Sequence, residues 1–217
     1  MRYTKREIYY LIPIFKEVYA EARKSYPNLR GVKIYIIDAM YINAFALGRK
    51  TVAVTKGAVE SLSEDELKGF IAHELGHIAH GDTKALLLTT VGNGIFMIFI
   101  IAAQFVMNII NSVIDRRGTT GLILRLMKLW FYMMLFYLLY IGQFILAINS
   151  RKNEYAADRF AFKIGYGDDL VSALYLLQDM CISDNAKLVD RLKASHPHIA
   201  KRIGKLEDMI DDAEQAN

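Results

Sequence analysis

The chain has 217 residues, 53% of them hydrophobic, a length that accommodates one ordinary domain with membrane helices rather than two full domains. Its net charge of +4 is spread without a basic stripe and interleaved aromatic residues, which argues against a nucleic-acid partner. Its single cysteine, Cys181, excludes an intrachain disulfide bond and any metal site built from several cysteines.

The N-terminal quarter of the chain predicts an amphipathic helix followed by a small sheet. The helix is opened by Thr4 and Glu7, and its apolar run is too short to cross a membrane and lacks the cleavage site of a signal peptide. Strand-like runs then cover 32–37, 43–48 and 51–55. A free sheet edge can pair with an extended peptide, although ordinary core packing explains these strands equally well. The apolar face of the helix is formed by Ile8, Leu11, Phe15, Val18 and Ala22.

The stretch 64–84 predicts a helix that carries a metal site. A capping-box pattern starts it at Ser63, and apolar residues recur along it at helical spacing. His73 and His77 are four residues apart, so they share one helix face and can reach one zinc ion. Glu74 lies beside the first histidine, where it can take a proton from an attacking water. This is the zincin pattern, although two unrelated histidines on a buried helix would give the same spacing.

Two long uncharged runs come next and predict a transmembrane hairpin over 85–150. No charged residue occurs in 85–114 or in 129–150, and about twenty apolar residues suffice to cross a bilayer. A buried hairpin of a soluble protein is the alternative. A membrane hairpin returns the chain to the same side, so 1–84 and 151–217 can complete one catalytic domain. The positive residues on the two sides do not decide the orientation.

After the predicted hairpin, Glu154 and Asp158 lie four residues apart on one helix face. A zincin needs a third zinc ligand, and the carboxylate of Glu154 would supply it. Asp158 would accept the free ring N–H of a ligand histidine and so fix its tautomer. A solvated acidic face is the other interpretation of this pair.

The C-terminal part contains two further helical patterns, over 170–177 and 188–192, and a final helix with Pro197 in its first turn. His196 and Arg202 belong to this last segment. Either side chain could donate a hydrogen bond to the oxyanion of a tetrahedral intermediate, whereas a capped surface helix is the simpler interpretation.

Taken together, these motifs resemble the HtpX-like membrane zinc metalloproteases, which form one gluzincin superfamily with the CAAX prenyl proteases. The resemblance implies an α+β fold, namely a mostly helical zincin-type metallopeptidase domain with a small β-sheet, interrupted by a two-helix transmembrane hairpin. The metzincin pattern does not fit, because it requires glycine and histidine where this chain has His80 and Thr83. The segments that carry the resemblance are 43–46, 67–82, 154–158 and 195–202.

The resemblance also assigns eleven residues to the site in five roles. The zinc ligands would be His73, His77 and Glu154, and the general base would be Glu74. Asp158 would be the hydrogen-bond partner of a ligand histidine, and His196 and Arg202 would lie near the substrate carbonyl. The edge strand that binds substrate would be formed by Asn43, Ala44, Phe45 and Ala46.

The activity implied is that of a zinc-dependent endopeptidase with one zinc ion per chain, anchored in the cell membrane by several spans with its catalytic domain on the cytosolic side. Its expected partners are the lipid bilayer and protein or peptide substrates, including misfolded or damaged membrane proteins. A non-catalytic membrane scaffold that keeps zinc for structure and a CAAX-type protease are the alternatives. The family is expected to carry a further membrane hairpin before the catalytic domain, and this sequence leaves open whether that hairpin is naturally absent or removed.

Overall fold

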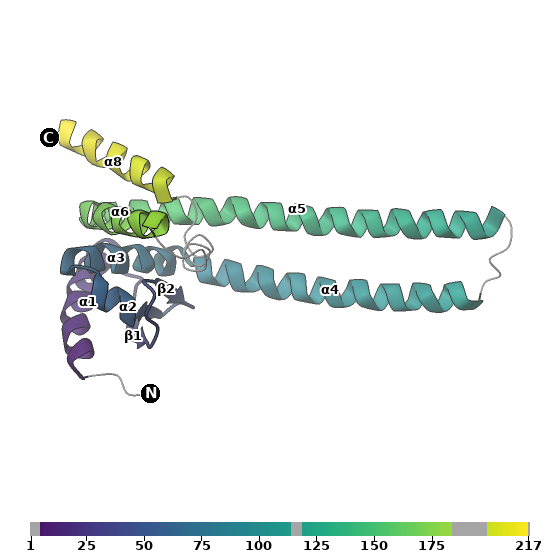
Figure 1. Cartoon of the computed structure of the whole chain (residues 1–217), viewed down its shortest axis with the longest axis horizontal. Helices are drawn as coiled ribbons and strands as arrows, with labels where there is room; N and C mark the ends of the chain where they lie inside the picture. Colours follow the sequence, from purple (N-terminus) through teal and green to yellow (C-terminus); the bar gives the residue numbers. More distant parts are fainter. Residues whose placement is uncertain (1–4, 114–118, 184–198, 217) are drawn as a thin grey trace. The chain divides into compact units, whose positions relative to one another are not determined.

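The computed structural model describes residues 5–113, 119–183 and 199–216, and most of them are helical (Figure 1). The chain divides into two compact units, Met1–Lys84 with Arg151–Asn217, and Ala85–Ser150. The first unit contains the small sheet and confirms the predicted mostly helical domain. In chain order its elements are α1 (Lys5–Ser25), β1 (Lys33–Ile37), β2 (Ala44–Leu47), β3 (Thr51–Thr55), α2 (Lys56–Ser61), α3 (Glu64–His80), the end of α5 (Thr119–Lys163), α6 (Gly167–Ser183) and α8 (Ile199–Gln215).

The sheet has three strands in the order β1-β3-β2, with β1 parallel and β2 antiparallel to the central strand β3. The β2–β3 hairpin forms around the predicted turn at 48–50. The Thr55 hydroxyl accepts a hydrogen bond from the Asn43 backbone N–H (2.9 Å) and lies 2.6 Å from the Tyr41 carbonyl oxygen. These contacts fix the chain segment that enters β2, and β2 lies at the edge of the sheet.

The start of α3 confirms the predicted capping box. The Ser63 hydroxyl accepts a hydrogen bond from the Glu66 N–H, and the Glu66 carboxylate accepts one from the Ser63 N–H (2.7 Å). These reciprocal bonds satisfy two of the N–H groups that a helix start leaves without partners. Three acidic residues in the first turn also suit the positive end of the helix dipole.

The end of α3 differs from the prediction, because the helix stops at His80 rather than near Lys84. Gly81 adopts a left-handed conformation with φ 76°, and its N–H donates to the His77 carbonyl oxygen at 3.0 Å. Glycine accepts this conformation without the steric cost of a Cβ atom. A new helix, α4 (Asp82–Val113), starts at the next residue, so the chain turns between the two.

The backbones of α3 and α5 approach closely at Gly76. A Cβ atom at this position would lie 2.9 Å from the Cα atom of Ala157, closer than packed atoms approach. Glu154 and Asp158 flank Ala157 in sequence, so this contact places both carboxylates against α3. The sequence predicted a new helix near Ser150, whereas α5 runs without interruption from Thr119 to Lys163.

The core of the first unit is formed by apolar side chains from α1, the sheet, α3, α5, α6 and α8. On the predicted apolar face of α1, Leu11, Phe15, Val18 and Ala22 are buried. Fully burying a leucine or valine side chain contributes about 1.5–3 kcal/mol, so this face attaches α1 firmly to the unit. Residues 188–192, for which a helix was predicted, lie outside the described residues.

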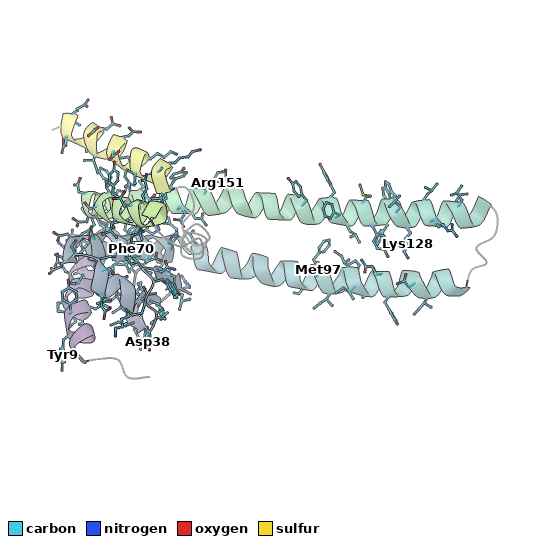
Figure 2. All side chains as sticks on the ribbon, in the orientation of Figure 1. Tyr9, Asp38, Phe70, Met97, Lys128 and Arg151 are labelled. Carbon is cyan, nitrogen blue, oxygen red and sulfur yellow. The ribbon has the colours of Figure 1, made fainter. Side chains whose placement is uncertain are left out.

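The second unit consists of α4 and the first part of α5, which lie side by side (Figure 1). Lys128 Nζ donates a hydrogen bond to Asn108 Oδ1 at 2.9 Å and links the two helices. Many large apolar side chains point outward (Figure 2). Among the residues that the structure describes, Gly121–Leu138 is long and apolar enough to cross a membrane, whereas the apolar stretch of α4, Gly94–Val106, is shorter. The predicted transmembrane hairpin therefore has one candidate span.

Candidate metal centre

Two histidines on successive turns of α3 direct one ring nitrogen each toward the same point. The Nε2 atoms of His73 and His77 lie 3.1 Å apart, and the two rings are nearly perpendicular, with centroids 4.7 Å apart. His73 is completely buried, and His77 is mostly buried. Two nitrogens that each lie 2.0–2.1 Å from a tetrahedral zinc ion are about 3.4 Å apart, so this spacing fits a shared metal ion.

Glu154 reaches the same point from α5. Its two carboxylate oxygens lie 3.5 Å from His73 Nε2 and 3.4 Å from His77 Nε2. The three ligand atoms are all within 4.8 Å of one another. Two imidazole nitrogens and one carboxylate oxygen form a donor set that zinc uses in catalytic sites. The structure thus brings together the three residues predicted as ligands, although the chain separates them by the whole second unit.

The other nitrogen of each ring faces a carboxylate. Asp158 Oδ1 lies 2.9 Å from His73 Nδ1, and Asp82 Oδ2 lies 2.8 Å from His77 Nδ1. Each carboxylate is placed to accept the Nδ1–H, so that Nε2 can bind a metal ion when the metal displaces its proton. The contact of Asp158 agrees with the predicted geometry. No role was predicted for Asp82, although an acidic residue directly after the glycine that ends α3 is a visible signal in the sequence.

Arg202, from α8, contacts the carboxylates of Asp158 and Glu154 and is buried, with 1% of the residue exposed. Its Nε and Nη2 atoms donate to the two oxygens of Asp158 at 2.8 and 2.6 Å. Its Nη1 atom lies 2.8 Å from Glu154 Oε2. Burial opposes the charge of Arg202, but Asp158 and Glu154 outweigh burial and raise its pKa, so the guanidinium stays positive.

The electrostatic field of the cluster favours positive charge between the rings. Burial lowers the pKa of His77, but hydrogen bonds with Asp82 and Glu154 outweigh burial and raise it to about 10. The pKa of His73 is also raised, because its bonds to carboxylates outweigh the effect of burial. A raised histidine pKa means that the surroundings stabilise a cation. The same surroundings would stabilise a divalent metal ion that takes the place of the protons.

Glu74 lies on α3 next to His73 and is buried, with 1% of the residue exposed. Its negative charge contributes to the raised pKa of His77 and of Arg202. The position fits a base beside the predicted metal ligands.

The predicted substrate strand lies at the edge of the sheet and contacts α3. In this strand Ala44 is buried, whereas Phe45 and Ala46 are half-buried. Asn43 precedes β2, and its buried side-chain Oδ1 atom has no hydrogen-bond partner among the residues that the structure describes. One edge of β2 pairs with β3, and within the described residues no strand pairs with the other. His196, predicted near the substrate carbonyl, lies outside the described residues.

Comparison with known proteins gives one family. Residues 7–210 match the model described as "Peptidase family M48". Protease HtpX of Shewanella frigidimarina is 31% identical over 215 residues, which cover 90% of this chain and 73% of the relative. Protease HtpX of Shewanella oneidensis is 32% identical over 200 residues, covering 83% and 68%. A Protease HtpX homolog of Helicobacter pylori is 29% identical over 196 residues, covering 82% and 61%.

Among solved structures, the chain resembles the crystal structure of S. mikatae Ste24p with a TM-score of 0.50 and 25% sequence identity. The match covers 87% of this chain and 49% of that chain. This chain therefore spans about half the length of the solved protein.

Proposed function

Since the chain belongs to peptidase family M48, as an HtpX-like metalloprotease, we propose that it is a membrane-anchored zinc endopeptidase. The observation that supports this most strongly is the cluster of His73, His77 and Glu154, with its ligand atoms within 4.8 Å of one another. The carboxylates on both Nδ1 atoms add to it, because they orient the two rings for metal binding.

One zinc ion per chain would be held by the two Nε2 atoms and the carboxylate of Glu154. When bound there, zinc supplies Lewis acidity that polarises the scissile carbonyl and lowers the pKa of water. Three protein ligands leave a position free for water or substrate, as in catalytic zinc sites.

The buried carboxylate of Glu74 acts as the general base. It takes a proton from the attacking water and later delivers that proton to the leaving amine. Asp158 and Asp82 hold the two histidines in the tautomer that leaves Nε2 unprotonated. The contacts of Arg202 support a positioning role, because it donates to both Asp158 and Glu154. Oxyanion contacts by Arg202 and His196 stay a prediction.

The substrate would bind in extended form along β2. A peptide that adds a strand to a sheet edge gains main-chain hydrogen bonds that depend little on sequence, while its side chains alternate between the two faces. Asn43, Ala44, Phe45 and Ala46 would form this edge. Such sequence-tolerant recognition suits an endopeptidase that acts on unfolded segments.

The outward apolar side chains of the second unit and the candidate span Gly121–Leu138 support anchorage in a lipid bilayer. We extend the proposal to a multi-pass protein of the cell membrane with its catalytic unit on the cytosolic side. Its substrates would then include misfolded or damaged membrane proteins, and its role would be protein quality control.

Metal removal tests this function. Cleavage of an unfolded, unprenylated protein by the detergent-solubilised full chain should fall to the level of the uncatalysed control after chelation. Cleavage should return when about one equivalent of zinc per chain is added, because the three proposed ligands bind the added ion again. Cleavage that survives complete zinc removal would contradict the proposal. Cleavage confined to a prenylated C-terminal tail would instead favour the CAAX-type alternative.

A further inference from the structure

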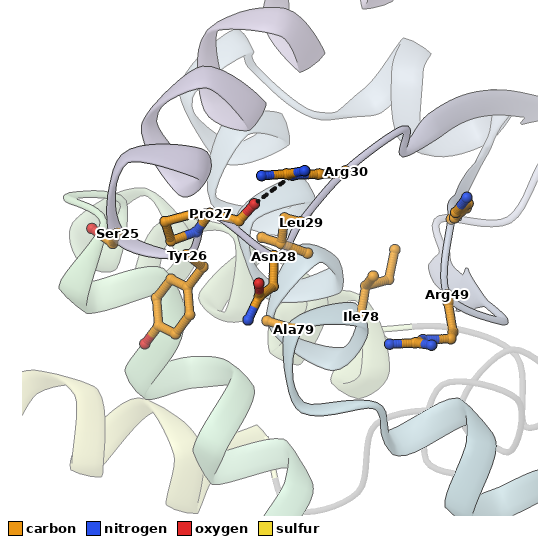
Figure 3. Close-up of a pocket in the computed structure, with 10 residues that line it drawn as sticks. Ser25, Tyr26, Pro27, Asn28, Leu29, Arg30, Arg49, Ile78 and Ala79 are labelled. Atoms are coloured by element: carbon orange, nitrogen blue, oxygen red, sulfur yellow. Dashed lines mark hydrogen bonds between the residues drawn. The ribbon is translucent and has the colours of Figure 1, made fainter.

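A second site is suggested by a pocket of about 400 Å³ that shares no residue with the metal cluster (Figure 3). Three segments form its wall: the turn after α1 at 25–30, the β2–β3 turn at 49–50, and the last turn of α3 at 78–79. All of them belong to the first unit.

The polar part of the pocket is positively charged. Arg30, Arg49 and Lys50 line it, and among the described residues no acidic side chain does. Arg30 Nε donates to the Pro27 carbonyl oxygen at 3.3 Å, and the structure gives its Nη groups no other bond within the described residues. Within the described part of the chain, Arg49 and Lys50 form no ion pair. Three cations that line one pocket favour an anionic ligand.

Part of the remaining wall of the pocket is apolar, and Ser25 and Asn28 add polar side chains beside it. Leu29 and Ile78 are buried, and the side chain of Arg49 extends toward Ile78 (Figure 3). The Leu29 N–H donates to the Tyr26 carbonyl oxygen at 3.0 Å, and the Leu29 carbonyl oxygen accepts from the Tyr19 hydroxyl at 3.0 Å. These bonds fix the turn after α1, so the pocket is formed before a ligand arrives.

We propose that this pocket binds the phosphate headgroup of an anionic lipid. A free phosphate ion would use only the cations, whereas a lipid headgroup also places its glycerol and first acyl carbons on the apolar wall. The position in the chain agrees, since Ile78 and Ala79 shortly precede the unit that begins at Ala85. This site rests on the membrane anchorage in the proposed function. Because Ile78 directly follows His77, the headgroup would contact the helix turn that carries the second histidine.

The test is native mass spectrometry of the detergent-solubilised full chain, titrated with short-chain phosphatidylglycerol, short-chain phosphatidylcholine or inorganic phosphate. Phosphatidylglycerol should bind most tightly, and Arg49→Gln with Lys50→Gln should weaken its binding about twenty-fivefold, since each cation contributes roughly a fivefold gain in affinity for an anionic headgroup. The control, Lys16→Gln with Lys163→Gln, removes two exposed cations elsewhere and should leave the affinity unchanged.

Equal binding of the two lipids would overturn the proposal, as would an equal loss in the control variant. Phosphate binding as tight as that of phosphatidylglycerol would show a site for a free anion instead. The measurement involves no cleavage, so a failed lipid site and a failed protease assignment give different results.

Discussion

Replacing Glu74 by glutamine is expected to lower kcat for peptide hydrolysis by about 10²–10⁴-fold while the chain keeps its zinc ion. Glutamine has nearly the same shape as glutamate but cannot take a proton from water. Because Glu74 is not one of the three metal ligands, the cluster of His73, His77 and Glu154 stays complete in this variant. Cleavage of an unfolded protein and zinc content per chain are the two quantities to measure.

Glu66→Gln is the matched control for this experiment. Glu66 lies on the same helix, and glutamine can replace glutamate in the capping box, so its activity should be unchanged. Wild-type cleavage by the Glu74→Gln chain would show that another group is the base. Loss of zinc together with activity would show that Glu74 supports the metal site rather than the proton transfer.

Replacing Arg202 by alanine is expected to lower the free energy of unfolding of the metal-free chain by about 3–5 kcal/mol. The guanidinium is the buried positive partner of Asp158 and Glu154, and its removal leaves two buried carboxylates, one turn apart on α5, without the cation that they share. We also expect zinc affinity to fall by about 10–100-fold, because the proposed metal ligand Glu154 and the carboxylate of Asp158 beside His73 both lose their orientation. Equilibrium denaturation and zinc titration measure the two effects.

A second variant at this position separates charge from geometry, and a variant of another arginine of the same unit serves as the control. Arg202→Lys keeps the positive charge but loses the two-pronged contact with Asp158, so it should give an intermediate loss. Arg159→Ala removes an exposed arginine of α5 and should change stability by less than about 0.5 kcal/mol. If Arg202 serves only the substrate carbonyl, Arg202→Ala would lower kcat and leave both stability and zinc affinity unchanged.

The predictable part of the site follows from local patterns. The spacing of His73 and His77, the capping box at Ser63 and the pair Glu154 and Asp158 each lie within one or two helical turns. Helix geometry alone then fixes which side chains share a face. Local patterns do not show which helices pack together. The candidate ligand Glu154 was therefore predicted from the need for a third zinc ligand and not from any contact visible in the sequence.

The unpredicted part depends on turns and on distant contacts. Gly81 ends α3 because its backbone is left-handed, and only this turn places Asp82 against His77. The buried pairing of Arg202 with Asp158 joins residues 44 positions apart, and α2 and the parallel pairing of β1 with β3 likewise depend on tertiary packing. Local propensity carries no information about such pairings. The same holds for the lining of the basic pocket, which comes from three separate segments.

X-ray absorption at the zinc edge, made on the purified full chain with its zinc quantified, tests the central claim most directly. We expect one zinc ion per chain, coordinated by two histidine nitrogens, a carboxylate oxygen and a position open to water. Glu154→Ala should remove the carboxylate contribution while the histidine signal weakens. A closed set of four protein ligands, or a spectrum that Glu154→Ala leaves unchanged, would contradict the account and favour a structural metal.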